Sequence, residues 1–316
     1  MTVTASDGSR SSTQAIAVTV TTVNDNTPVI TSLATANFAE NATGTVIDVN
    51  ATDADLPAQT LTFSITGGAD AAKFAINATT GIVTFVTSPD FEAPTDAGAN
   101  NVYDLQVTAS DGALSVAQSI AVTVTAVNDN TPVITSAATA NFAENATGTI
   151  LTVQATDADL PAQTLTYSIS GGVDAAKFAI NATTGALTFV TSPNFEAPTD
   201  VGANNVYNVQ VTASDGANST NQALAITVTA VNDNAPVFTS ALTASFAENG
   251  TGTVIDVNAT DADLPGDTLT FSISGGVDAA LFAIDSATGA LTFITPPDFE
   301  APADSGANNI YNVQVT

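Results

Sequence analysis

The sequence predicts an all-β protein made of tandem seven-stranded antiparallel β-sandwiches. Three observations support this fold class. The hexapeptide Val-Asn-Asp-Asn-x-Pro begins at Val23, Val127 and Val231, so a unit of 104 residues recurs. Apolar residues alternate with polar ones in short runs, as in strands that bury one face. Turn residues separate these runs, and helical periodicity of useful length is missing. Each unit is long enough to bury its own core.

The domain boundaries follow from this period. We expect residues 1–23 to be the last strands of a preceding repeat, 28–127 and 132–231 to be whole repeats, and 236–316 to be a repeat that lacks its last strand. Met1 aligns with Leu105, inside a unit, so any export signal is expected outside this sequence. A two-strand remnant is not expected to be stable alone.

The first whole repeat shows its strands in chain order. It opens with residues 28–30, continues with a short edge segment at 37–41, and reaches a longer strand at 45–52. The alternation in that strand predicts two faces, one with Ile47, Val49 and Ala51 and the other with Val46, Asp48 and Asn50. A helical turn at 69–73 is expected after the next strand.

The remaining strands carry their own signals. Gly67-Gly68, Thr80-Gly81 and Asp111-Gly112 are expected to end strands or turn the chain. The alternating apolar positions are Leu61, Phe63 and Ile65, then Phe74 and Ile76, Val83 and Phe85, Tyr103, Leu105, Val107 and Ala109, and finally Ile120, Val122 and Val124.

Charge restricts the possible partners. The chain has 31 Asp and Glu but only 3 Lys and Arg, which gives a formal net charge of −28. Such a surface repels nucleic acid and anionic membranes. Acidity could simply keep the protein soluble, but most of the acids gather in short recurring motifs. The chain has no Cys and no His, which excludes thiolate and imidazole metal sites and His-based triads. No segment is apolar enough to cross a bilayer.

Five motifs recur in a fixed order in each unit. In the first unit these are Ala-Glu-Asn at 39–41, Ala-Thr-Asp-Ala-Asp at 51–55, Asp-Phe-Glu at 90–92, Ala-Ser-Asp-Gly at 109–112 and the linker at 127–132. Together they resemble the calcium motifs of the cadherin family over essentially the whole chain. The resemblance implies Ig-like Greek-key sandwiches in an extended rod, of the kind found in bacterial surface adhesins or fibres, outside the cell.

The resemblance also implies a ligand set. Ca²⁺ takes about six to eight oxygen ligands, from carboxylates, amide and backbone carbonyls and water. About two or three ions per junction are expected. Between the first two whole repeats the implied ligands are Glu40, Asp90, Glu92, Asn128, Asp129, Asn130, Asp157, Asp159 and Asp215. Glu40, Asp90 and Glu92 would bridge the lower ions and share Asp129, while Asp157, Asp159 and Asp215 would hold the outer ion.

The next junction departs from this pattern. Its matching residues are Glu144, Glu196, Asn232, Asp233, Asn234, Asp261 and Asp263. Asn194 stands where Asp90 and Asp298 stand, so one charge is lost and weaker affinity is expected. The matching positions toward the two ends of the chain are Asn24, Asp25, Asn26, Asp53, Asp55 and Asp111, and Glu248, Asp298 and Glu300. The Asp-Ala-Asp loop also lacks the Gly-x-Asn that often follows it in the family.

Three functions remain open. The first is a calcium-stiffened stalk of an extracellular adhesin or surface filament, whose repeats provide length. The second is a module that binds another copy of itself or a polysaccharide. The third is an enzyme, which we do not expect because every close pair of acids lies in a metal motif. Asn-x-Thr sequences, such as those at Asn41 and Asn77, fit either glycosylation or ordinary turns.

The two ends of the sequence give a further expectation. As an independent molecule, the polypeptide would use its residues 1–23 to complete the open sandwich 236–316 of a neighbour, in head-to-tail fibres formed by strand donation. As a window of a longer protein, it would make the same contacts covalently.

Overall fold

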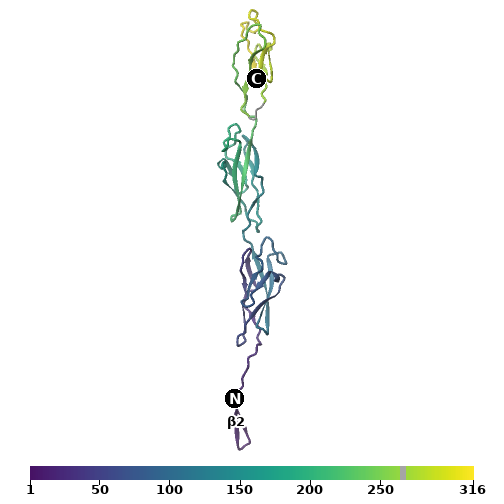
Figure 1. Ribbon diagram of the computed structural model, residues 1–316, viewed down its shortest axis with the longest axis vertical. Coiled ribbons are helices and arrows are strands. Elements are labelled where there is room, and N and C mark those ends of the chain that lie inside the picture. The colour runs from purple at the N-terminus through teal and green to yellow at the C-terminus, as the bar shows by residue number, and fades with distance from the viewer. Residues whose placement is uncertain (264–267) are drawn as a thin grey trace. The chain divides into compact units, whose positions relative to one another are not determined.

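The structure is a computed structural model that describes residues 1–263 and 268–316. Within these residues the regular elements are strands and three short 3-10 turns, which confirms the all-β class (Figure 1). The chain divides into two compact units. The first holds residues 1–131 and 157–164, and the second holds residues 132–156 and 165–316.

The first unit contains one complete sandwich. One sheet has the order β4-β11-β10-β7, and the facing sheet has the order β5-β9-β8 with the separate pair β3-β6. The strands are β3 (Val29–Ile30), β4 (Thr35–Ala39), β5 (Thr45–Asp48), β6 (Ala51–Thr52), β7 (Thr62–Gly67), β8 (Phe74–Ile76), β9 (Ile82–Phe85), β10 (Val102–Ser110) and β11 (Ser115–Thr125). The 3-10 turn η1 (Ala71–Lys73) lies at the predicted helical turn. Since β3 with β4 and β5 with β6 are interrupted strands, this is the predicted seven-stranded sandwich.

The second unit repeats this sandwich. Its sheets have the orders β13-β20-β19-β16 and β14-β18-β17, with the pair β12-β15. The strands are β12 (Val133–Ile134), β13 (Thr139–Ala143), β14 (Thr149–Thr152), β15 (Ala155–Thr156), β16 (Thr166–Gly171), β17 (Phe178–Ile180), β18 (Ala186–Phe189), β19 (Val206–Ser214) and β20 (Ser219–Thr229), with η2 (Ala175–Lys177).

The same unit also contains the third set of strands, which is less complete. It has β21 (Val237–Phe238), β22 (Thr253–Asp256), β23 (Ala259–Thr260), β24 (Ile273–Gly275), β25 (Phe282–Ile284), β26 (Ala290–Phe293) and β27 (Gln314–Val315), with η3 (Ala279–Leu281). Residues 243–247 belong to no strand, although their sequence Thr-Ala-x-Phe-Ala matches β4 and β13.

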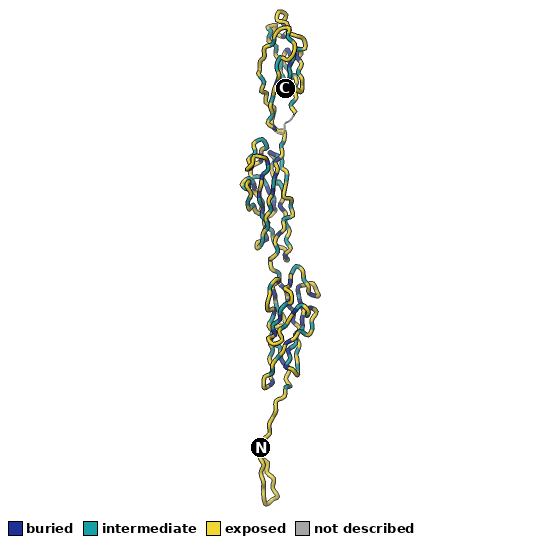
Figure 2. Tube along the Cα trace, in the orientation of Figure 1, coloured by how far each residue is buried: buried dark blue, intermediate teal, exposed yellow. Residues whose placement is uncertain are grey.

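The core lies between the two sheets, where the alternating positions predicted it. Tyr103, Leu105 and Val107 of β10 are at most 1% exposed, and so are Ile120, Val122 and Val124 of β11. Figure 2 shows buried residues in dark blue along the strands of the sandwiches. Phe85 packs its ring 4.5 Å from Phe74 and 5.2 Å from Tyr103, edge-on to the latter. Such aromatic geometry adds to the energy of burial.

Two expectations about single strands are wrong. Val46 was expected opposite Val49, yet both are buried, at 8% and 0% exposure. A register shift between Thr45 and Ile47 interrupts the alternation, as a β-bulge does. The sandwich is also not purely antiparallel, because β4 pairs with β11 in parallel. The chain crosses from the facing sheet to the far edge of this one, so β4 runs in the same direction as the last strand.

The N-terminal segment differs from its predicted strands. The structure has a hairpin of β1 (Thr2–Ser6) and β2 (Ser11–Ala15), and every residue from 1 to 23 is exposed. The strand expected at 14–20 therefore ends early, and residues 16–20 belong to no strand. Backbone hydrogen bonding in the hairpin continues one residue further, because Ile16 N donates to Met1 O at 2.9 Å.

Candidate metal centres

Glu40 follows β4 and is held by the backbone. Glu40 is 2% exposed, and its carboxylate accepts hydrogen bonds from Phe91 N at 2.7 Å and Val127 N at 2.6 Å. These donors come from the Asp-Phe-Glu turn and from the linker. Glu40 therefore joins two segments that are far apart in sequence, and its carboxylate keeps a fixed position.

Glu40 is the buried member of a group of three acids. A ligand oxygen of Glu40, one of Asp90 and one of Glu92 lie within 4.8 Å of one another. Asp90 forms a turn by accepting a hydrogen bond from Ala93 N at 3.0 Å. Burial raises the pKa of Glu92, and the neighbouring Glu40 raises it further. The fold therefore brings like charges close together here, which disfavours the ionised form of Glu92.

Glu92 also belongs to a second group, with Asp129 and Asp159. These oxygens again lie within 4.8 Å of one another. Asn130 donates from Nδ2 to Asp159 at 2.7 Å, and Leu160 N donates to Glu92 at 3.0 Å. Burial opposes ionisation of Asp159, but the hydrogen bonds from Asn130 outweigh burial and lower its pKa. Glu92 thus links the acids of the Asp-Phe-Glu turn to those of the linker and the following loop.

A third group in this unit consists of Asp53, Asp55 and Asp111. Asn26 donates to Asp55 from Nδ2 at 2.5 Å and from its backbone N at 3.0 Å. The Asn26 side chain is the main reason that the pKa of Asp55 is lowered. Oδ2 of Asp53 is buried and has no hydrogen-bond partner among the described residues. A buried carboxylate oxygen without a partner is unstable unless a cation satisfies it.

The second unit repeats the arrangement around Glu144, Glu196 and Asp233. Glu144 is 2% exposed and accepts from Phe195 N and Val231 N, both at 2.7 Å. Both carboxylate oxygens of Glu196 are buried without a hydrogen-bond partner in the described part of the chain. Burial raises the pKa of Glu196, and the neighbouring carboxylate of Glu144 raises it further.

The linker of the second unit is held in the same way. Asn234 donates a hydrogen bond from Nδ2 to the Asp263 carboxylate at 2.7 Å. The backbone N atoms of Asp233 and Asn234 also donate to this carboxylate, at 3.2 and 3.0 Å. Asp261 accepts a hydrogen bond from Asp263 N at 3.0 Å. Asn194 accepts a hydrogen bond from Ala197 N at 2.7 Å, so it forms the same turn as Asp90 with one charge less.

The remaining predicted ligands lie in loops at the ends of the sandwiches. Asp157 and Asp159 belong to the first unit and Asp215 belongs to the second, where it accepts hydrogen bonds from Ala217 N and Asn218 N. Glu248 is exposed, unlike Glu40, and it raises the pKa of Glu300 through a hydrogen bond. The remaining predicted linker residues lie in the same loops as Asn26, Asn130 and Asn234. These residues are Asn24, Asp25, Asn128 and Asn232.

The sequence interpretation missed one position of the centres, which Asn41 and Asn145 occupy in the two repeats. Asn41 has a positive φ of 55° and donates from Nδ2 to Asp129, and Asn145 does the same to Asp233. Each Asn thereby orients the linker Asp next to the acids. Its place in the Ala-Glu-Asn motif, directly after Glu40, could have identified it.

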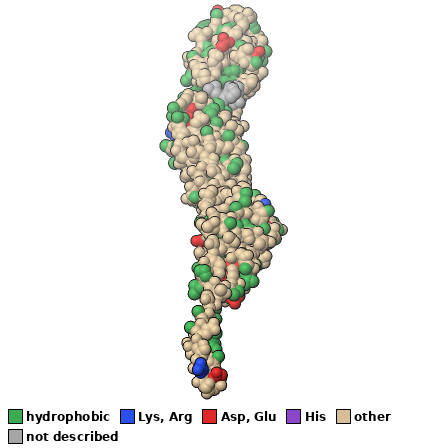
Figure 3. Space-filling view, turned by 60° about the horizontal axis from the view of Figure 1, so that its bottom comes forward, with side chains coloured by type: hydrophobic (Ala, Val, Ile, Leu, Met, Phe, Trp, Pro, Cys, Tyr) green, Lys and Arg blue, Asp and Glu red, His purple; other side chains and the backbone are tan. Residues whose placement is uncertain are grey.

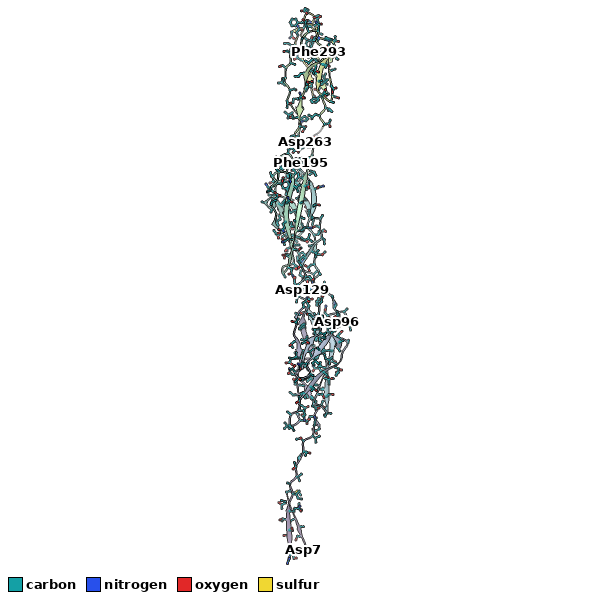
Figure 4. All side chains as sticks on the ribbon, viewed as in Figure 1. Asp7, Asp96, Asp129, Phe195, Asp263 and Phe293 are labelled. Carbon is teal, nitrogen blue, oxygen red and sulfur yellow. The ribbon has the colours of Figure 1, made fainter. Side chains whose placement is uncertain are left out.

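The donor set fits a calcium ion. The groups offer carboxylate and amide oxygens only, which are the ligands that this hard cation prefers. Several of the carboxylate oxygens are buried and have no hydrogen-bond partner among the residues that the structure describes, so a cation would satisfy them. Figure 3 shows Lys and Arg at only a few places on the surface, and Figure 4 labels Asp129 and Asp263 at two of the centres.

A family model described as the cadherin domain matches residues 34–127 and 138–230. The chain belongs to the cadherin family. This confirms the resemblance that the motifs indicated, while a bacterial origin stays a prediction.

The cadherin relatives are long proteins. Protocadherin Fat 1 of Homo sapiens is 32% identical over 324 residues, which cover 95% of this chain but 7% of that protein. The protocadherin-like wing polarity protein stan of Drosophila melanogaster is 35% identical over 276 residues, covering 81% of this chain and 7% of its own length. The chain therefore spans a small part of the curated relatives that it matches.

Solved cadherin structures share the fold. Mouse cadherin-23 EC22-24 has a TM-score of 0.67 and 26% identity, covering 87% of this chain and 90% of that structure. The protocadherin GammaB4 extracellular domain has a TM-score of 0.66 and 27% identity, covering 92% and 47%. This cadherin segment is extracellular or at the cell surface, as the sequence predicted. A search of the described residues finds no helix that is both long and apolar enough to span a bilayer.

Proposed function

We propose that this cadherin segment is a calcium-rigidified extender of an extracellular adhesion protein, with Ca²⁺ bound where one repeat follows another. The observation that carries the proposal is that Glu92 lies in one group of acids with Glu40 and in a second group with the linker residue Asp129. These acids come from three motifs that are widely separated in sequence. Together with their equivalents Glu144, Glu196 and Asp233, they make each linker a site of concentrated negative charge.

Electrostatics explains why a cation is needed. Two carboxylates about 4 Å apart repel by about 4 kcal/mol at an effective dielectric constant of 20. Three acids within 4.8 Å of one another contain three such pairs. Divalent ions would turn this repulsion into attraction and would fix the linker against the acids on either side of it.

We assign the ligands to the ions in the way that the family resemblance implies. Glu40, Asp90, Glu92 and Asp129 would hold the inner ions, and Asp157, Asp159 and Asp215 the outer ion, with about two or three ions per junction. When bound, Ca²⁺ supplies charge neutralisation and cross-linking of the linker. The Asn side chains hold the acids in place, and Glu40 keeps its position through the backbone N–H groups.

A calcium titration tests this function. We expect the melting temperature of the metal-stripped chain to rise with Ca²⁺, because a ligand present at about 100 times its Kd stabilises the folded state by about 2.7 kcal/mol. Asp129→Ala should reduce the rise. Asp285→Asn is the matched control, since it removes an acid from a turn in which Asn77 and Asn181 stand in the other repeats.

Two outcomes would contradict the proposal. One is a melting temperature that does not respond to Ca²⁺. The other is an equal loss of response in Asp129→Ala and Asp285→Asn, which would mean that the effect comes from overall charge. Small-angle scattering with and without chelator then tests the stiffening, since the metal-free chain should sample more compact shapes.

A further inference from the structure

Each complete sandwich holds an early strand and its last strand side by side in parallel. β4 pairs with β11 over the five residues of Thr35–Ala39. β13 pairs with β20 over the five residues of Thr139–Ala143. Glu40 N and Glu144 N each add one more backbone hydrogen bond to the last strand of their sandwich, at 3.1 and 3.0 Å. This parallel ladder therefore joins the start of each sandwich to its end.

A pull on the two ends of a sandwich loads this ladder in shear. The chain reaches β4 through the preceding linker and β3, and it leaves β11 for the linker that begins at Val127. Because β4 and β11 run in the same direction, these linkers leave the ladder at opposite ends. Tension would slide β4 along β11, so the evenly spaced hydrogen bonds of the parallel ladder would have to break together. β3 pairs with β6 over only two residues and adds less resistance.

Two side chains extend this connection beyond the ladder. The Glu40 carboxylate accepts a hydrogen bond from Val127 N at 2.6 Å. The next residue, Asn41, donates from Nδ2 to Asp129. Asn41 keeps its position because its positive φ of 55° turns the chain there and its backbone N donates to Pro89 O at 2.9 Å. The two residues that follow β4 thus hold the linker at the point where it leaves β11.

The second unit has the same two contacts. Glu144 accepts a hydrogen bond from Val231 N at 2.7 Å. Asn145 has a φ of 56° and donates from Nδ2 to Asp233. The recurrence shows that these contacts belong to the repeat rather than to one site. Hydrogen bonds to an ionised partner are about twice as strong as neutral ones, so these contacts are suited to resist a force on the linker.

We propose that each complete sandwich bears tension along the chain, through a shear clamp and a latch. In the first unit the clamp is β4 with β11, and the latch is Glu40 with Asn41. In the second unit the clamp is β13 with β20, and the latch is Glu144 with Asn145. Both parts consist of hydrogen bonds within the protein, so they act without metal. Only their use, in an extender that is pulled from both ends, rests on the proposed function.

Pulling the first sandwich in two directions tests the clamp. The chain has no Cys, so pairs of Cys substitutions can attach the handles for single-molecule force spectroscopy at chosen exposed positions of the full chain. Leu33→Cys with Thr131→Cys loads the ladder in shear, because the two handles lie beyond its opposite ends. Leu33→Cys with Ser119→Cys pulls the strands apart across the sheet. Both of these residues lie two positions before the first pair of the ladder, which is Thr35 with Ala121.

The two directions should give different unfolding forces in chelator. In shear the five residue pairs share the load, whereas across the sheet one pair carries it at a time. Because forced unfolding is governed by the unfolding rate, we expect the shear direction to need at least about twice the force of the other direction. Equal forces in the two directions would overturn the clamp.

Asn41→Gly tests the latch, because Gly tolerates the positive φ but has no side chain to hold Asp129. With the shear handles we expect the unfolding rate at a fixed force to rise about tenfold or more, as for the loss of a hydrogen bond to a charged group. With the handles at positions 33 and 119 the rate should change less than about twofold, because unfolding starts at the other end of the ladder while the latch is still intact.

The control removes a hydrogen bond that lies off the path of the load. Thr66 and Thr108 join their hydroxyl groups at 2.7 Å between β7 and β10, in the same sheet as the clamp. Thr66→Ala should therefore leave the ratio of the two unfolding forces unchanged. An Asn41→Gly effect of equal size in both directions would show that Asn41 only stabilises the fold, and it would overturn the latch.

Calcium separates this inference from the proposed function. The forces are compared in chelator, so bound metal cannot produce the difference between the two directions. If shear needs the higher force but Ca²⁺ changes no melting temperature, the clamp holds and the metal function fails. If Ca²⁺ raises the melting temperature but the two directions need equal force in chelator, the metal function holds and the clamp fails.

Discussion

At the scale of single residues, an acid in this chain has one of two roles. Asp70 is 4% exposed, and its two oxygens accept hydrogen bonds from Ala97 N at 2.7 Å and Asp104 N at 2.9 Å. Asp96 is satisfied in the same way by Gly98, Asn100 and Asn101. These acids stabilise loops. Glu196, whose buried oxygens have no such donors among the described residues, is left with its charge unsatisfied and is suited to bind a cation.

Asn194 should make the calcium affinity of the second junction lower than that of the first. Asn194→Asp adds a carboxylate in a turn that already has the geometry of Asp90, so we expect calcium affinity at the second junction to rise about tenfold. Asp90→Asn should lower affinity at the first junction by a similar factor. Isothermal titration calorimetry measures both variants. Unchanged affinity in both would show that this position is not a ligand.

The pH dependence of the metal-free chain should follow Glu92 and Glu196. Their pKa values are raised in the folded state, so the folded state binds these protons more tightly than the unfolded state. Stability should therefore increase as pH falls from neutral through the folded pKa, toward the unfolded value of about 4.3. The pKa values of Asp55 and Asp263 are lowered in the folded state, so these residues stabilise the fold when they are ionised. Their contribution to the free energy of unfolding is lost only at lower pH, as they become protonated.

Glu196→Gln isolates this effect. In chelator at neutral pH the variant should melt higher than wild type, because it lacks the repulsion with Glu144. The difference should shrink as the pH is lowered toward 5, and in calcium the order should reverse because a ligand is lost. Thermal melts at several pH values check this. A variant that melts below wild type in chelator at neutral pH would contradict the assignment.

At the scale of elements, the last strand of each complete sandwich holds its neighbours together. β11 supports β4 and closes the core over Phe38 and Tyr103, and β20 does the same for β13. An edge strand without such a partner would leave its hydrogen-bonding groups in water.

Alanine substitutions at two glycines should distinguish the cost of backbone strain from the cost of a packing clash. Gly68 and Gly112 both have φ near +100°, but a Cβ at Gly68 would lie 2.3 Å from Leu105 Cα, whereas a Cβ at Gly112 meets nothing within 4 Å. We expect Gly112→Ala to destabilise the first sandwich by about 1 to 2 kcal/mol through strain alone. Gly68→Ala should cost more than about 3 kcal/mol, because β10 must also move. Urea unfolding compares them, and equal losses would contradict the clash.

At the scale of the whole molecule, the net charge of −28 is a general force against folding without metal. Sodium chloride at about 1 M shortens the Debye length to about 3 Å, so it should raise the melting temperature of the metal-free chain. The calcium-loaded chain should respond less, because its junction charges are already neutralised. A salt series in chelator and in calcium measures this. Equal responses in the two series would show that the junctions do not dominate the repulsion.

The sequence by itself determined the fold class, the repeat and the sets of acids. Alternation placed Tyr103 and Val122 in the core because side chains in a strand point to opposite faces, which is a local property. The recurring motifs predicted which acids come together, and the structure groups Glu40 with Asp90 and Glu92.

Only the tertiary structure decided the details that depend on neighbours. The burial of Val46 came from a bulge against β9, and the parallel pairing of β4 came from the position of β11 across the sandwich. The contact of Asn41 with Asp129 joins residues 88 apart. A strand forms only where a second strand satisfies its backbone, and the residues that provide it lie elsewhere in the chain.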